Sequence, residues 1–423
     1  MNVKQLFEER KSGNQWNTSY PVKPMDWNQF RISAPLSFSL DHELSMYVHI
    51  PFCKQLCTFC EYTRTLCPED NLQTFYLKTL LNDIDRFISQ NKPFILKGFD
   101  IGGGTPTALT EECFEQLMSV YTYVMAQTSQ ATDFEPSIES TFQTISESKL
   151  RLIASSGIQR ISLGVQSSLP SITSSAKRMS AQLSQMEDVI DKARQAGIKK
   201  INLDFMYGLK NQTIQSLSKD LQLIKHLHPE QVTLYELRTN MINESAHTTV
   251  SQRYEMYCLF YDTLLELGYY APFGQNTFSL NNYDMGLSSY LRNRMVNCTP
   301  YKGFGISAQS MNTNGISYNI GKNQSSIIDL IQEETYKEEF TYLLPHNEVA
   351  SKYLAIAAYS GAFSLITLSR LLHSDANDYY KEQINFCLEN HLLSLDKNIL
   401  RITRNGFKYY GAVFSLFYFP SAS

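Results

Sequence analysis

Six short apolar runs alternate with helix-length segments between Ser45 and Leu267, and this alternation constrains the fold more than any other feature of the sequence. The apolar runs read SMYVHI, KGFDI, PSIES, RISLG, KINLDFM and QVTLY. The longer segments begin near Asn71 and Thr110 and then cover roughly 146–155, 181–195, 213–226 and 250–267. Strand–helix units repeated at this spacing indicate parallel strands with helices outside them. We therefore expect an α/β fold, a partial (β/α)6 barrel.

The segments on either side of this core predict additional parts, because 423 residues exceed what one hydrophobic core usually organises. An N-terminal extension covers 1–44 and the α/β core covers 45–268. Residues 269–324 are rich in Gly, Asn and aromatic residues, and we expect loops or short strands there that close the barrel. Residues 325–423 are expected to form a small helical domain. The DKN and NG turn signals between its last apolar runs predict a wing-like hairpin.

Composition narrows the classes of protein to which the chain can belong. A net charge of −4 gives no electrostatic case for nucleic acid as a partner. No run of eighteen apolar residues could span a membrane, and the polar N-terminus lacks the apolar core of a signal peptide. We expect a cytoplasmic protein whose thiols stay reduced. Cysteines that stand singly are expected to be buried or free: Cys67, Cys113, Cys258, Cys298 and Cys387.

Three cysteines stand together directly after the first expected strand. Cys53, Cys57 and Cys60 have the spacing C-x3-C-x2-C, and three thiolates in one loop suit an iron–sulfur cluster. A structural zinc site usually has four ligands, for which His49 is the nearby candidate. His49 lies within the expected strand, so zinc is the weaker interpretation, as is a chance group of unliganded thiols. A cluster held by only three thiolates leaves one iron open to bind another molecule.

The glycine-rich stretch GGGTPT follows the second expected strand just as the cysteines follow the first. In parallel β/α barrels the chemistry lies at the C-terminal ends of the strands. Both motifs are therefore expected at the same mouth of the barrel.

The cysteine spacing resembles the signature of the radical S-adenosylmethionine (SAM) superfamily. Five motifs in order from 47 to 310 resemble its oxygen-independent coproporphyrinogen III oxidase-like branch: YVHIPFC, FDIGGGTPT, GIQRISLGVQS, INLDFMYGL and GISAQS. The resemblance implies a [4Fe–4S] cluster whose open iron chelates SAM. It also implies reductive cleavage of SAM to a 5′-deoxyadenosyl radical, with an electron donor such as flavodoxin or ferredoxin.

The resemblance also assigns roles to individual residues. The cluster ligands would be Cys53, Cys57 and Cys60. The residues around the first SAM would be Tyr47, Gly103, Glu139, Gln166, Arg178 and Asp204. Some members of the branch bind a second SAM, and the matching positions here are Phe59, Gly104, Thr105, Arg238 and Gln309. Carboxylates suit ribose hydroxyls or an ammonium group, and an arginine fork suits a carboxylate.

Two departures from the family pattern bear on the reaction. Coproporphyrinogen oxidases of the branch carry a further cysteine where this chain has Tyr62, and its haem chaperones carry a histidine where this chain has Gln309. The remaining pattern resembles the methyltransferases and cyclopropanases of the branch. That resemblance implies transfer of a methyl or methylene group from a second SAM to an sp2 carbon of a small conjugated substrate, such as a tetrapyrrole or another aromatic metabolite.

Other functions remain open at this point. Oxidative decarboxylation of coproporphyrinogen III is one, and a non-catalytic carrier of a cluster or haem is another. A DNA-associated regulator using the wing is disfavoured by the acidic balance. The loop after the cysteines offers Glu61, Tyr62 and Arg64 as candidates for proton transfer. The aromatic residues between 269 and 318 could line a pocket, although ordinary core is the favoured interpretation.

Overall fold

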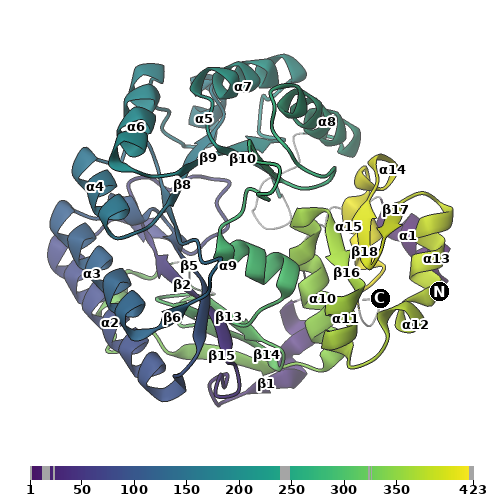
Figure 1. The fold of residues 1–423 in the computed structure, drawn as a ribbon, viewed down its shortest axis with the longest axis horizontal. Coiled ribbons are helices and arrows are strands. Elements are labelled where there is room, and N and C mark those ends of the chain that lie inside the picture. The colour runs from purple at the N-terminus through teal and green to yellow at the C-terminus, as the bar shows by residue number, and fades with distance from the viewer. Residues whose placement is uncertain are drawn as a thin grey trace.

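A computed structural model describes residues 2–11, 20–21, 24–238, 248–322, 324 and 326–418. Its centre is a large mixed sheet with helices on the outside (Figure 1). Within the described ranges, six neighbouring strands of this sheet are parallel and follow one another in chain order. They are β2 (Glu43–Ile50), β5 (Ile95–Gly103), β7 (Ser137–Ser140), β8 (Arg160–Gln166), β9 (Lys200–Tyr207) and β10 (Gln231–Glu236). The expected α/β class and its parallel strands are confirmed.

The helices that join these strands begin and end close to where the sequence predicts them. They are α2 (Asp70–Asn91), α3 (Glu111–Gln127), α4 (Glu147–Ser155), α6 (Leu183–Ala196), α7 (Ile214–Leu227) and α8 (Val250–Glu266). Hydroxyl caps fix several of their starts, since Thr110, Ser146 and Thr213 each accept a backbone N–H from the first turn.

The segment 269–324 does not close the barrel, which corrects that expectation. Its first strand, β11 (Thr277–Ser279), pairs antiparallel with β10 at one edge of the sheet, and β12 (Tyr301–Phe304) pairs parallel with β2 at the other. Beyond β12 the sheet continues antiparallel through β13 (Gln309–Asn312), β14 (Gly315–Asn319), β15 (Glu338–Leu343) and β1 (Arg31–Ile32). The sheet is therefore open.

The chain does not become helical at residue 325 either. β15 still belongs to the main sheet, and α10 begins only at residue 346. The following elements are α10 (His346–Ala357), β16 (Ala362–Ser364), α11 (Leu365–Leu372), α12 (Ala376–Tyr379), α13 (Lys381–Glu389), β17 (Leu393–Asp396), β18 (Ile399–Ile402), α14 (Arg404–Phe407) and α15 (Tyr410–Ser415). The predicted hairpin is β17–β18, with β16 as a third strand. Its turn is the DKN signal, whereas the NG pair lies inside α14.

The N-terminal helix α1 (Val3–Arg10) packs on the C-terminal helices, and Figure 1 shows it among them at one side of the molecule. The Phe7 and Phe386 rings lie 5.7 Å apart, and the Arg10 guanidinium donates to the Ser415 carbonyl at 2.5 Å. The beginning and the end of the described chain thus form one packed unit.

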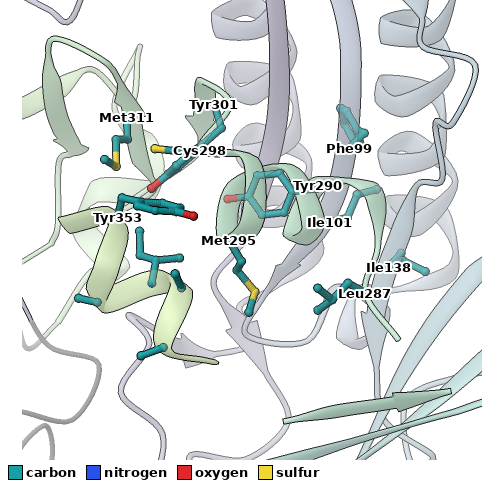
Figure 2. Close-up of a cluster of buried hydrophobic side chains, with 14 of the residues drawn as sticks. Phe99, Ile101, Ile138, Leu287, Tyr290, Met295, Cys298, Tyr301, Met311 and Tyr353 are labelled. Carbon is teal, nitrogen blue, oxygen red and sulfur yellow. The ribbon is translucent and has the colours of Figure 1, made fainter. Parts of the chain in front are cut away.

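A short helix, α9 (Ser289–Arg292), and the π-helical turn η4 (Asn293–Asn297) pack between the parallel strands and α10. Figure 2 shows Tyr290 and Met295 from this connection between β5 on one side and Tyr353 of α10 on the other. Many aromatic side chains between 269 and 318, such as Tyr269 and Tyr301, are buried core, as expected. No helix in the described ranges is long and apolar enough to cross a membrane.

Candidate active site

The cysteine loop leaves the C-terminal end of β2 and is fixed at its base by a small parallel pair, β3 (Phe52–Cys53) and β4 (Thr65–Leu66). The Arg64 guanidinium donates to the Cys57 carbonyl at 2.5 Å and to the Tyr62 carbonyl at 3.1 Å. Arg64 therefore holds the loop in shape. Cys53 and Cys57 are buried, Cys60 is half-buried, and all three are free thiols. The scattered cysteines are free as well, as expected.

The surroundings of the thiols suit a bound anionic cluster. Burial raises the pKa of Cys53 to about 11 and also raises the pKa of Cys60, while the nearby Arg64 lowers both. Arg178 Nη1 lies 3.9 Å from Cys57 Sγ. The thiols of Cys53 and Cys60 are therefore protonated until a metal displaces their protons, and two guanidinium groups lie beside the cysteine loop to face the thiolates.

The donor set fits an iron–sulfur cluster better than a single ion. In the described part of the chain, no three His, Cys, Asp or Glu side chains are set to hold one metal ion. In a [4Fe–4S] cluster each thiolate binds a different iron, so the three soft ligands do not need to converge on one point. When bound, such a cluster supplies one electron and an open iron.

The glycine-rich end of β5 lies directly on the start of the cysteine loop. Gly104 N donates to Ile50 O and Thr105 N donates to Phe52 O, both at 2.8 Å. Gly103 has φ +112°, and a Cβ there would lie 2.4 Å from the His49 ring. Only glycine permits this approach. The structure therefore brings the two predicted motifs together at one mouth.

His49 supports the loop and does not act as a fourth metal ligand. Its Nε2 donates to Thr63 O at 2.9 Å, and burial lowers its pKa to about 4. The ring is thus neutral, and its Nδ1 accepts from the Tyr47 hydroxyl at 3.4 Å. Tyr47 in turn stacks on Tyr290, with ring centroids 5.6 Å apart. The zinc interpretation through His49 finds no support in this geometry.

Two carboxylates lie on β7 and β9, the strands on either side of β8. Glu139 on β7 accepts the Gly103 N–H at 3.1 Å, and burial together with Asp204 raises its pKa to about 7. Asp204 on β9 accepts from Ser162 Oγ and Asn202 Nδ2, both at 2.8 Å, and burial raises its pKa too. A cationic ligand with hydroxyl groups would stabilise both charged carboxylates.

Gln166 and Arg178 complete this group between the strand ends and the cysteine loop. Gln166 has φ +65° at a bulge in β8, and its Oε1 is buried with no hydrogen-bond partner in the described structure. Arg178 Nη2 donates to Gly164 O at 2.8 Å. A strained residue with an orphaned buried amide is typical of a site that binds a polar ligand. All the residues predicted around the first SAM thus belong to this mouth.

The residues predicted around a second SAM already have partners of their own. Phe59 packs against the apolar side chains of Ile172, Met206, Leu209 and Leu237. Arg238 forms an ion pair with Glu61. Gln309 Oε1 accepts from Arg294 at 3.2 Å and from Tyr301, and its Nε2 donates to Tyr318 at 2.8 Å. Thr105 Oγ1 lies 3.9 Å from Cys53 Sγ. A second SAM site stays a prediction.

The remaining candidates for proton transfer, Glu61 and Tyr62, face the interior of the mouth. Tyr62 is 55% exposed, yet burial raises its pKa well above the ordinary value, with Glu139 and Glu61 nearby. Glu61 Oε2 has no hydrogen-bond partner within the described residues.

Sequence reasoning missed several charged residues of this region. Three cationic residues lie close enough for their charges to interact: Arg294 on η4, Lys322 after β14 and Lys352 on α10. Lys149 on α4 donates to Thr107 O at 2.9 Å and Leu109 O at 2.7 Å, behind the glycine segment. Lys322 and Lys352 stand alone in the sequence, and Arg294 and Lys149 each have one arginine two residues away, so no local pattern distinguishes these four residues from ordinary surface charges.

Comparison with known proteins places this site in a class. Residues 47–224 match the model of the Radical SAM superfamily. The fold is similar to that of coproporphyrinogen III oxidase (HemN) from Escherichia coli, with a TM-score of 0.72, 20% identity, and 89% of this chain and 90% of that chain covered. The chain therefore contains a radical SAM domain.

Sequence relatives narrow the assignment. A haem chaperone (HemW) of Bacillus subtilis is 31% identical over 46% of this chain and 50% of its own length. An oxygen-independent coproporphyrinogen III oxidase of Bradyrhizobium diazoefficiens is 28% identical over 62% of this chain and 61% of its own length. The chain thus spans between half and two thirds of these relatives. These relatives support a likeness to the coproporphyrinogen III oxidase-like branch and give no support to the expected affinity with methyltransferases.

Proposed function

We propose that this protein is a radical SAM enzyme that oxidises a tetrapyrrole of the coproporphyrinogen III type without oxygen. One observation carries the proposal. The cysteine loop lies against the glycine end of β5, and the orphaned amide of Gln166 and the Glu139 and Asp204 carboxylates surround the same mouth. The substrate class is taken from the names of the relatives.

The residues divide the work of SAM cleavage. Cys53, Cys57 and Cys60 would hold the cluster, which supplies the electron and an open iron. Asp204 and Glu139 would accept hydrogen bonds from the ribose and ammonium groups of SAM, and Arg178 would bind its carboxylate. Fixing SAM in one orientation before reduction lowers the barrier through proximity.

The proposed reaction balances in atoms and electrons. Bound SAM and cluster would supply the chemistry that removes one hydrogen atom from a propionate side chain of the substrate. The substrate radical then loses CO2 and passes one electron to an external one-electron acceptor, which leaves a vinyl group. A separate donor, such as a flavodoxin or ferredoxin, reduces the cluster for each cleavage of SAM.

The test is anaerobic turnover of coproporphyrinogen III by the reconstituted protein with SAM, a low-potential reductant and a one-electron acceptor. We expect 5′-deoxyadenosine and vinyl-bearing product to accumulate together. Formation of S-adenosylhomocysteine together with a methylated tetrapyrrole would show that the protein transfers a methyl group to this substrate and does not decarboxylate it. Deoxyadenosine without any change in coproporphyrinogen would reject this substrate.

A haem-carrying function is the second candidate, since a haem chaperone is among the relatives. The hydrogen bonds of Gln309 argue against it as an iron ligand. Its amide oxygen accepts from Arg294 and Tyr301, and its amide nitrogen donates to Tyr318. Tight binding of haemin, with no deoxyadenosine formed in the presence of coproporphyrinogen III, would favour this function over the enzyme.

A further inference from the structure

Three cationic side chains from three separate elements lie within electrostatic range of one another. Two of them also share neighbours, since Arg294 donates to Gln309, Gln309 donates to the Tyr318 hydroxyl, and Lys322 lies over the Tyr318 ring. Arg294 comes from η4, Lys322 follows β14 and Lys352 lies on α10. The charge of Arg294 lowers the pKa of both Lys322 and Lys352, and the charge of Lys322 also lowers the pKa of Lys352. Segments that are distant in the sequence thus place like charges together.

Arg294 has a donor that the protein leaves unused. Its guanidinium lies 5.1 Å from the centre of the Tyr301 ring, and one Nη donates to Gln309 at 3.2 Å. Its Nε is buried and has no hydrogen-bond partner in the described structure. An unsatisfied buried guanidinium donor points to an absent acceptor, because such groups are normally paired.

Among the described residues, the two lysines also have no carboxylate partner. Lys322 Nζ lies 5.2 Å from the centre of the Tyr318 ring, and Lys352 Nζ donates to Tyr20 O at 2.8 Å. Neither forms an ion pair with any residue in the described ranges. Burial, and after it the charges of Arg294, Lys322 and Arg238, lower the pKa of Lys352 to about 7.

Among the described residues, Glu61 is the acid that raises the pKa of Lys322, and Glu61 is itself paired with Arg238. The region therefore keeps an excess of positive charge. Unpaired cations in a partly desolvated site destabilise a protein unless a ligand supplies the opposite charge.

The cations border the reacting part of the mouth. Lys322 acts electrostatically on His49 under the glycine segment, and Arg294 lies near Tyr47 and Tyr62. The tyrosines offer flat apolar faces and the cations offer donors to oxygen anions. A flat ring with carboxylate arms matches both features.

We propose that Arg294, Lys322 and Lys352 form a carboxylate-binding wall that holds the acidic side chains of the substrate at the barrel mouth. The proposal rests on the proposed function, whose substrate class carries several propionate groups, and it names the residues of this chain that select them. Arg294 binds a carboxylate through its fork, and the lysines add point charges.

The test measures binding of two probes to the protein reconstituted with its cluster. Coproporphyrin III is a tetrapyrrole with four carboxylates, and mellitate is a flat polycarboxylate that is not a tetrapyrrole. Arg294→Gln and Lys322→Met are expected to raise the dissociation constant of both probes about tenfold or more. The tetramethyl ester of coproporphyrin should bind weakly and equally to all forms. Lys337→Met, which removes an exposed lysine on the neighbouring segment, is the matched control and should change nothing.

The possible outcomes distinguish failure of the carboxylate-binding wall from failure of the proposed substrate. Unchanged affinity for both probes in the two variants would overturn the wall while leaving the proposed function in place. Arg294-dependent binding of mellitate without binding of coproporphyrin would support the wall and reject a tetrapyrrole substrate. Unfolding curves and cluster absorbance of the variants confirm that they are folded and loaded.

Discussion

At the scale of single residues, the site depends on polar groups that the protein itself leaves incompletely satisfied. Gln166 Oε1, Glu61 Oε2 and Arg294 Nε are buried without hydrogen-bond partners in the described structure. Such groups destabilise the unliganded protein, and their acceptors and donors are expected from bound molecules. Arg178 differs, since it already bridges Gly164 O and the Cys57 sulfur.

Arg178→Gln should weaken SAM binding, because it removes the guanidinium beside the cysteine loop. A lost hydrogen bond to a charged group corresponds to a dissociation constant raised roughly 10- to 100-fold. Calorimetric titration of SAM into the reconstituted protein measures it. Arg194→Gln, which removes an exposed arginine paired with Glu230, is the control. Equal SAM affinity in wild type and Arg178→Gln would reject the assigned contact.

At the scale of elements, the mouth depends on how closely β5 approaches the cysteine loop. Gly103 and Gly197 both have strongly positive φ, at +112° and +100°. A Cβ at Gly103 would lie 2.4 Å from the His49 ring, whereas nothing lies within 4 Å of one at Gly197. Alanine substitutions at these two glycines therefore distinguish the effect of backbone strain from the effect of crowding at the site.

Gly103→Ala should reduce SAM cleavage strongly, since His49 and the loop that it supports must move. Gly197→Ala should lower stability by about 1–2 kcal/mol through backbone strain alone and leave cleavage intact. Unfolding midpoints and deoxyadenosine yields of the two variants give the comparison. Equal yields would show that the close approach is not needed.

Lys149 is a second link between elements, because its ammonium ties α4 to the segment after the glycines. Lys149→Met leaves the buried Thr107 and Leu109 carbonyls without this donor and should destabilise the protein by about 2–4 kcal/mol. Lys192→Met removes an ion-paired lysine at the surface and should leave stability almost unchanged. Denaturant unfolding of both variants measures the difference, and equal values would contradict the structural role of Lys149.

At the scale of the whole molecule, the sequence predicts the radical SAM core well and its surroundings poorly. The period of strands and helices is a local property of the chain, so the six units and the cysteine and glycine motifs can be placed from the sequence alone. The motif residues Glu139, Gln166 and Asp204 are assigned through the family resemblance of the segments that contain them, and not from the strand pattern alone.

The remainder depends on contacts between distant segments. β12 joins β2 although the two strands are far apart in the sequence, and β1 pairs with β15 from opposite ends of the chain. Short strands of this kind carry little periodicity, and their pairing is decided by tertiary packing. The same holds for Arg294, Lys322 and Lys352, which become neighbours only when η4, β14 and α10 assemble around the mouth.

The burial of Lys352 near other cations predicts a pH dependence of stability. The pKa of Lys352 falls from 10.5 to about 7 on folding. The folded protein therefore binds fewer protons than the unfolded chain between these values, so this residue destabilises fully below pH 7 and less as pH rises towards 10.5. Lys352→Met should be more stable than wild type by roughly 2–4 kcal/mol at pH 6, with little difference at pH 10. Denaturant unfolding of wild type and Lys352→Met at both pH values measures the difference in stability. A difference that does not change with pH would contradict its origin in the titration of Lys352.

The most direct measurement is the yield of 5′-deoxyadenosine from SAM and dithionite by the anaerobically reconstituted protein. We predict that wild type forms it and that Cys57→Ser does not. Cys67→Ser should retain it, because Cys67 lies at the base of the same loop but outside the predicted ligand set. Protein loaded with four irons that forms no deoxyadenosine, or Cys57→Ser that forms as much as wild type, would contradict the assignment of this site to radical SAM chemistry.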